Sequence, residues 1–188
     1  MAVEIELKFS IPENSNLEND FPTFTPIDIE NHYYDTENND LYEMHWSYRI
    51  RIKNGIRQVT LKTPTKEKNQ RNEWECDIRD NDPIKSLISI GAPSEISNYN
   101  LVHKCSAVYQ RRLVLIENDS FKAELCIDRG YVTAKNKKAP LYELELELIN
   151  GSLDGLKRYA DSLCERYGLK EDTVSKHKKA LNILKDRV

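Results

Sequence analysis

Short segments in which apolar and charged residues alternate recur along most of the chain. The first runs from Val3 to Phe9, where apolar residues alternate with two glutamates and a lysine. Alternation with a period of two places successive side chains on opposite faces of a β-strand. Turn sequences separate these segments, and Asn54-Gly55 is typical of a two-residue β-hairpin. The pattern predicts about eight strands, most of them antiparallel to their neighbours.

Helical signals are fewer. Helices are predicted within residues 13–21, 83–103, 152–167 and 173–188. The third has the clearest ends, because Ser152 is a favoured N-cap residue and Gly168 a favoured stop. Neither a linker nor an internal repeat is visible. We therefore expect one α+β domain over residues 1–188.

Composition excludes several classes of protein. The formal net charge is -3, which argues against a generally basic nucleic-acid-binding protein. The sequence has no apolar run near the ~20 residues that span a membrane. Its four cysteines lack CxxC spacing, as expected of reduced structural thiols. We expect a cytoplasmic protein that binds neither nucleic acid nor membranes.

The charged positions of the predicted strands fall into rows of one sign. The acidic positions are Glu4, Glu6, Glu124, Asp128, Glu143, Glu145 and Glu147, and the basic positions are Lys8, Arg49, Arg51, Lys62 and one of Arg111 and Arg112. Like charges at adjacent positions of a sheet are mildly unfavourable. The rows either form a solvated face or line the cavity of a closed eight-stranded sheet. In a cavity, carboxylates would bind a hard divalent cation, and Arg and Lys would bind phosphates.

Several short motifs follow one another in order along the chain. They are Glu4-x-Glu6-x-Lys8, Tyr34-Asp35-Thr36, Tyr48-Arg49-Ile50-Arg51, Thr60-Leu61-Lys62, Arg71-x-Glu73, Asp128-x-Gly130, Glu143-Leu144-Glu145-Leu146-Glu147 and Ser175-Lys176. This ordered set, which spans nearly the whole chain, resembles the triphosphate tunnel metalloenzymes, also called the CYTH superfamily. The likeness is greatest to bacterial inorganic triphosphatases. The resemblance implies an eight-stranded antiparallel β-barrel with flanking helices, whose tunnel takes a triphosphate lengthwise.

The resemblance also implies roles for individual residues. The ligands of a Mg²⁺ or Mn²⁺ cofactor would be Glu4, Glu6, Asp128, Glu143 and Glu145. Substrate phosphates would be bound by Lys8, Arg49, Arg51, Lys62, Arg71, Arg112 and Lys176. The catalytic group would comprise Glu4, Glu6, Lys8 and Lys62. Two choices stay open: Glu147 in place of Glu143, and Arg111 in place of the preferred Arg112. Lys176 could also be a surface residue, and Glu73 a less certain residue of the tunnel.

The function implied by the resemblance is metal-dependent hydrolysis of tripolyphosphate to pyrophosphate and phosphate, by a monomer or homodimer acting on a small-molecule triphosphate. An adenylate cyclase or a thiamine triphosphatase would share the fold, but each needs a pocket for its base or thiazole ring. A non-catalytic polyphosphate-binding module would keep the basic rows and lose the acidic ones. A structural β-domain would leave both kinds of row in solvent. One departure from the family is the polar segment after the first strand, which is shorter than the helix usual there.

Overall fold

In the described part of the chain, nine strands form one antiparallel sheet that closes on itself. The computed structural model describes residues 2–21, 25–66 and 70–184, and of residues 2–4 and 25 it describes only the backbone. The strands are β1 (Ala2–Ser10), β2 (Thr25–Asp35), β3 (Ser47–Lys53), β4 (Ile56–Pro64), β5 (Gln70–Asp77), β6 (Val102–Glu117), β7 (Phe121–Ala134), β8 (Lys137–Gly151) and β9 (Lys170–Glu171).

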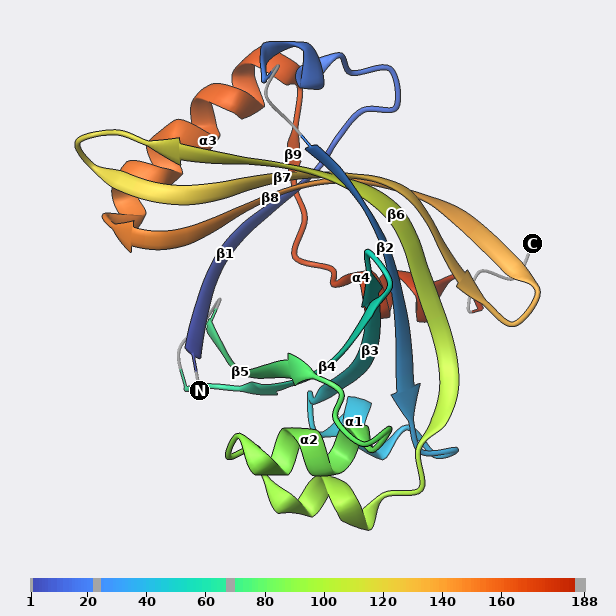
Figure 1. Cartoon of the computed structure of the whole chain (residues 1–188). Helices are drawn as coiled ribbons and strands as arrows, with labels where there is room; N and C mark the ends of the chain where they lie inside the picture. Colours follow the sequence, from blue (N-terminus) through green and yellow to red (C-terminus); the bar gives the residue numbers. More distant parts are fainter. Residues whose placement is uncertain (1, 22–24, 67–69, 185–188) are drawn as a thin grey trace.

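The strand order is β5-β4-β3-β2-β6-β7-β8-β1-β9, and an additional pairing between β1 and β5 closes the ring (Figure 1). Eight strands build the barrel, while β9 adds two residues to the end of β1. The closed eight-stranded antiparallel barrel predicted from the sequence is therefore confirmed. The hairpin at Asn54-Gly55 is confirmed too, because both residues have the positive φ angles that its tight turn requires.

The helices flank the barrel. They are η1 (Leu17–Asp20), α1 (Asp40–Glu43), α2 (Pro83–Ser89), η2 (Ser94–Asn98), α3 (Leu153–Tyr167) and α4 (Lys176–Asn182). Ser152 caps α3 by accepting a hydrogen bond from the Gly155 amide, and Gly168 ends it in the left-handed conformation. The insertion after β5 is shorter than expected, since β6 already begins at Val102. The last helix begins at Lys176, and the predicted end at 185–188 lies outside the described residues.

Apolar side chains face out of the barrel, where the helices cover them. Outer-face residues of β7 and β8, such as Leu125 and Leu146, pack with Leu156 of α3, and residues of β4 pack with Leu87 of α2. Figure 1 shows α3 above β7 and β8, and α2 below β4 and β5. In most sheets with one buried face, the apolar side chains lie inside and the charged ones face solvent. Here the apolar faces point outward to the helices, and the charged faces line the interior of the barrel. No described helix is long and apolar enough to cross a bilayer.

The inner face becomes apolar toward one end of the barrel, and α4 packs against it there. Val132 of β7, Leu141 of β8 and Cys105 of β6 form a cluster with Ala180 of α4. Gly130 allows the close approach of β6 and β7 beside this cluster, because a Cβ atom at this position would lie 2.2 Å from the Val108 carbonyl oxygen. Helix α4 thus reaches the interior with its first residues, Lys176 and His177, which are both buried.

The Tyr34-Asp35-Thr36 motif has a structural role at the end of β2. The Asp35 carboxylate is buried and accepts hydrogen bonds from the amides of Thr36, Leu41 and Tyr42, at 2.7 to 2.9 Å. The bonds from Leu41 and Tyr42 satisfy amides at the start of α1 that have no partner within the helix. The motif therefore fixes the turn that carries the chain from β2 to β3.

Candidate functional site

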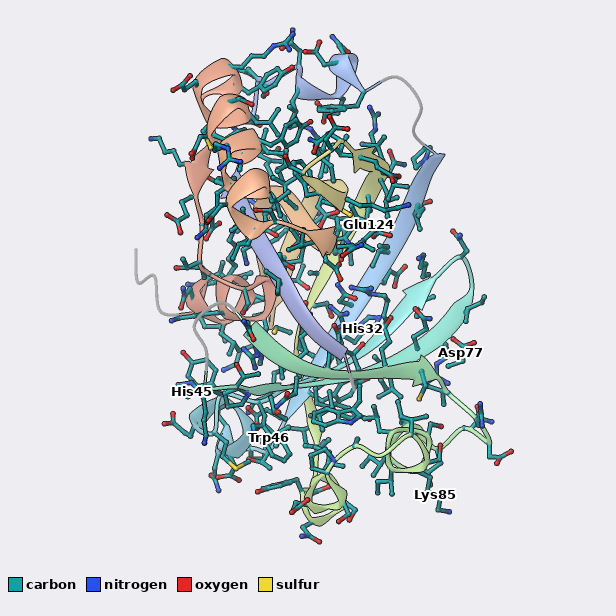
Figure 2. The ribbon with its side chains drawn as sticks, turned by 90° about the vertical axis from the view of Figure 1, so that its left-hand side faces the viewer. His32, His45, Trp46, Asp77, Lys85 and Glu124 are labelled. Atoms are coloured by element: carbon teal, nitrogen blue, oxygen red, sulfur yellow. The ribbon has the colours of Figure 1, made fainter. Side chains whose placement is uncertain are left out.

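The barrel encloses a cavity of about 640 Å³. Its charged lining residues are Glu6, Lys8, Arg49, Arg51, Lys53, Lys62, Glu73, Glu75, Arg111, Glu124, Glu145, Glu147 and Lys176. Seven of the strands and α4 contribute these charged residues, and Glu124 of β7 is labelled in Figure 2. The charged side chains of the alternating segments therefore line one cavity and do not form a solvent-exposed face.

One wall of the cavity is basic and comes mainly from β3 and β4. Arg49 donates to the Thr60 hydroxyl (3.1 Å) and its Nη2 lies 3.2 Å from Glu75. Lys62 lies 3.5 Å from Glu73. Burial raises the pKa of Glu75, but Arg49 and Arg51 outweigh it and bring that pKa to about 2. Glu73 and Glu75 of β5 therefore orient the cationic side chains of this wall. Those side chains still line the cavity.

Arg51 is held by a buried chain of hydrogen bonds. Its Nε donates to Asn31 Oδ1 at 2.9 Å, and Asn31 Nδ2 donates to the Tyr109 hydroxyl at 2.9 Å. Asn31 is completely buried and Tyr109 nearly so. Sequence reasoning did not select either residue. The signal was available at Asn31, a polar residue at an inward position between Ile29 and Tyr33.

Three carboxylates form a row across the opposite wall. In the strand register Glu6 of β1 is the partner of Glu147 of β8, and Glu147 is the partner of Glu124 of β7. Side chains at such directly opposed positions have Cβ atoms about 4.5–5.5 Å apart. We call Glu6, Glu124 and Glu147 the carboxylate row. Among the described residues, Glu124 forms no ion pair.

A second group of acids lies deeper, beside α4. Asp128, Glu143 and Glu145 can each place one carboxylate oxygen within 4.8 Å of the others. We call these three residues the buried acid cluster. Lys176 Nζ lies 2.9 Å from Asp128 and 2.6 Å from Glu143, and it also contacts Glu145. Arg111 binds both oxygens of Asp128, at 2.8 and 2.7 Å.

Ionisation in the buried acid cluster is set by these contacts. Burial alone would lower the pKa of Lys176, but Asp128, Glu145 and Glu143 raise it well above its usual range. Burial likewise raises the pKa of Glu145, but Lys176 and Arg111 lower it well below its usual range. The contacts within the cluster therefore favour the charged forms of Lys176 and Glu145.

Several residues predicted from the sequence lie away from the cavity. Arg111 lines it, whereas Arg112 lies on the opposite face of β6 because successive side chains of a strand alternate. The preference for Arg112 over Arg111 was therefore wrong as to position. Glu143 is fully buried beside α4 and is absent from the lining, while Glu147 belongs to it.

Two further predicted residues need separate mention. Arg71 lines an adjoining cavity of about 490 Å³, shared with Lys8 and Lys62, and its guanidinium donates to the backbone carbonyls of His45 and Lys62. The side chain of Glu4 lies outside the description, although its backbone pairs with Arg71. Lys8 lines both cavities, and no described carboxylate lies within ion-pair distance of its ammonium group.

Comparison with known proteins agrees with this geometry. The family model of the CYTH domain matches residues 2–181. The chain belongs to the CYTH family. The resemblance found in the sequence motifs is thus confirmed for nearly the whole length of this CYTH protein.

Solved structures show the same fold. A Hippeastrum protein, a candidate adenylyl cyclase described as having a dominant triphosphatase activity, is 16% identical with a TM-score of 0.64, and the match covers 95% of both chains. A Pyrococcus horikoshii protein is 19% identical with a TM-score of 0.63, over 98% of this chain and 99% of that one. A candidate adenylate cyclase from Bacillus halodurans is 18% identical with a TM-score of 0.62, over 93% and 96%.

CYTH tunnel enzymes use divalent metal ions, and the donor chemistry of this chain can be compared with that need. The carboxylate row offers only oxygen ligands, which suit Mg²⁺ and Mn²⁺. Its aligned carboxylates would repel one another without a cation between them. The residues of the cavity therefore fit a divalent cation at the carboxylate row, next to the basic wall.

Proposed function

We propose that this CYTH protein is a metal-dependent inorganic triphosphatase, which hydrolyses tripolyphosphate to pyrophosphate and phosphate. The observation that carries the proposal is the pairing of a basic wall with a carboxylate row inside one cavity of the barrel. Phosphoryl transfer asks a protein mainly for positioning and for neutralisation of charge. A cavity with oriented arginines and lysines on one wall and metal-binding acids on the other meets both needs.

In this mechanism the basic wall binds the phosphate chain. Arg49 and Arg51 present guanidinium donors whose orientation is fixed by Thr60 and Asn31, and a guanidinium can bind two phosphate oxygens at once. Lys8 and Lys62, which line both this cavity and the adjoining one, add compact positive charges. These four residues bind the phosphate chain of the substrate and neutralise its negative charge.

The carboxylate row would hold the divalent cation, beside Glu145, whose oxygens contact Arg111 and Lys176. When bound, the metal ion supplies Lewis-acid polarisation of a phosphoryl oxygen and lowers the pKa of a bound water. Water adds to a terminal phosphorus, the bond to the bridging oxygen breaks, and pyrophosphate leaves with that oxygen. Preoriented donors and charges that line a cavity stabilise developing charge more strongly than the same groups do in bulk water.

A substrate panel tests the proposal. Phosphate release is measured from tripolyphosphate, ATP, thiamine triphosphate and pyrophosphate, each with Mg²⁺ and with Mn²⁺. We expect kcat/KM for tripolyphosphate to exceed that for ATP by at least about tenfold, or roughly 1.4 kcal/mol of transition-state binding. Equal or faster turnover of ATP, or cyclic AMP as a product, would contradict the proposal in favour of a nucleotide enzyme.

A matched pair of arginine variants controls for non-specific effects. Arg49→Ala removes a cation of the basic wall and should reduce kcat/KM by at least about a hundredfold, or roughly 2.7 kcal/mol. Arg112→Ala removes an arginine from the outer face of β6 and should retain activity within about threefold. Binding of tripolyphosphate without turnover by the wild type would indicate a non-catalytic polyphosphate-binding module.

A further inference from the structure

The buried acid cluster looks at first like a second metal site. Asp128, Glu143 and Glu145 bring three carboxylates together, and all of their donors are oxygen atoms. Such a set is of the type that binds Mg²⁺ or Mn²⁺. It also lies next to Glu147, which belongs to the carboxylate row. The question is whether any of the cluster oxygens is available to a metal ion.

Cationic side chains of the chain itself lie within ion-pair distance of all six oxygens of the cluster, although neither oxygen of Glu143 accepts a hydrogen bond. Arg111 binds both oxygens of Asp128 and also Glu145 Oε2. Lys176 Nζ contacts Asp128 Oδ2, Glu143 Oε2 and Glu145 Oε1. The remaining oxygen, Glu143 Oε1, contacts Lys179. A divalent cation could bind in the cluster only by displacing these groups.

Packing of α4 keeps the Lys176 ammonium in place. Ser175 caps the helix by accepting from the Lys178 amide at 3.2 Å, and Ala180 is fully buried in an apolar cluster. The neighbouring His177 ring stacks on Tyr33 with centroids 4.9 Å apart. Withdrawal of Lys176 would disrupt these contacts and leave three buried carboxylates facing fewer cations, which is costly.

We infer that the ammonium group of Lys176 replaces a second divalent cation, so that the cavity holds one metal ion per chain, at the carboxylate row. This inference rests on the proposed function, because it concerns how many metal ions serve the reaction. It changes the role expected for Lys176 from substrate binding to charge neutralisation within the protein. Lys176 is then a positioning residue for Glu145, the member of the buried acid cluster that lines the cavity.

The experiment counts bound Mn²⁺ by electron paramagnetic resonance in the absence of substrate. The wild type is compared with Lys176→Met, whose unbranched side chain is one atom shorter and carries no charge. The matched control is Lys179→Met, the same substitution at a lysine that contacts only Glu143 within the cluster. We expect one Mn²⁺ per chain in the wild type and the control, and two in Lys176→Met. A single Mn²⁺ in a folded Lys176→Met would overturn the inference.

A second variant decides the matter if Lys176→Met does not fold. Asp128→Asn removes one charge from the buried acid cluster while keeping its shape. We expect the Mn²⁺ count to stay at one and the Kd to stay within about threefold of the wild type, because Asp128 would not be a ligand. Loss of one of two Mn²⁺ ions, or a tenfold weaker Kd, would overturn the inference.

A third readout separates this inference from the proposed function. The ¹⁵N resonance of the Lys176 ammonium group, assigned by its absence in Lys176→Arg, should persist when Mg²⁺ is added. Its loss on addition of Mg²⁺ would show that the metal displaces the lysine, and would overturn the inference. If the wild type binds no divalent cation, the proposed metal-dependent function fails. Even then, a Mn²⁺ site gained in Lys176→Met would support the inference that the Lys176 ammonium group occupies the place of a divalent cation.

Discussion

Removing the amide of Asn31 tests whether the basic wall depends on a buried hydrogen-bond chain. Asn31 is fully buried and joins Tyr109 to Arg51 by two bonds of 2.9 Å each. In Asn31→Ala both partners lose a bond, and an unpaired buried polar group costs about 1–3 kcal/mol. We expect the free energy of unfolding to fall by about 2 kcal/mol. For a chain of this length, that change lowers Tm by roughly 4–8 °C.

The same variant should also reduce catalysis, because Arg51 loses the group that orients its guanidinium. A hydrogen bond to a charged group contributes about 1.5–3 kcal/mol. If that orientation is needed in the transition state, kcat/KM for tripolyphosphate should fall roughly 10- to 150-fold. The assay is phosphate release with saturating Mg²⁺ or Mn²⁺, performed at a temperature where thermal melting shows the variant to be folded.

Asn31→Asp is the matched control. It keeps the shape of the side chain and the acceptor for Arg51 Nε, and the Tyr109 hydroxyl can donate to it. It should melt within a few degrees of the wild type, while its charge offsets that of Arg51 and raises KM. The reasoning would be refuted by wild-type kcat/KM in an Asn31→Ala variant whose stability has fallen as expected. Arg51 would then be oriented without Asn31.

Three further predictions concern the metal, pH and packing. Glu6→Gln should abolish activity and shrink the metal-induced rise in Tm, which for the wild type reflects about RT ln(1 + [M]/Kd) of stabilisation; an unchanged rise would exclude Glu6 as a ligand. Burial lowers the pKa of His177 to about 4, so below pH 6.5 the unfolded chain binds more protons and stability should fall by about 2 kcal/mol between pH 6.5 and 5. His177→Phe, which keeps the stacking on Tyr33, should flatten that part of the profile in denaturant unfolding, and a slope equal to the wild type would contradict this assignment. Gly130→Ala should cost about 3 kcal/mol, the upper part of the usual range for overpacking, because its Cβ would meet the backbone of β6, and an unshifted denaturant midpoint would argue against that close approach.

The barrel could be predicted because alternation and turn residues agree along most strands. The choice between Arg111 and Arg112 could not be made in this way. Both faces of β6 mix charged and apolar residues, so Leu113 follows Arg111 on the inner face and Val114 follows Arg112 on the outer face. The choice is decided by the register of β6 and β7, which makes Arg111 the partner of Asp128. This pairing belongs to the tertiary structure and is not visible in the sequence of β6 alone.

The division of the acidic residues between two groups was also hidden in the sequence. Glu143, Glu145 and Glu147 are equally spaced on one face of β8, so alternation treats them alike. Their environments differ because α4 covers the end of the barrel near Glu143 and brings Lys176 and Lys179 to it. Periodicity does not predict how far along β8 the later helix α4 packs.

The closure of the barrel has a consequence for how the chain folds. Residues 2–10 of β1 need partners at residues 70–73 of β5 and 143–147 of β8. Pairings between such distant segments cost loop-closure entropy before their contacts form, so they are slow steps of folding. During synthesis the edges of β1 remain without β8 until most of the chain has been made, and open strand edges pair readily with other chains. The ring that shields the charged cavity in the finished protein therefore exposes the nascent chain to aggregation for most of its synthesis.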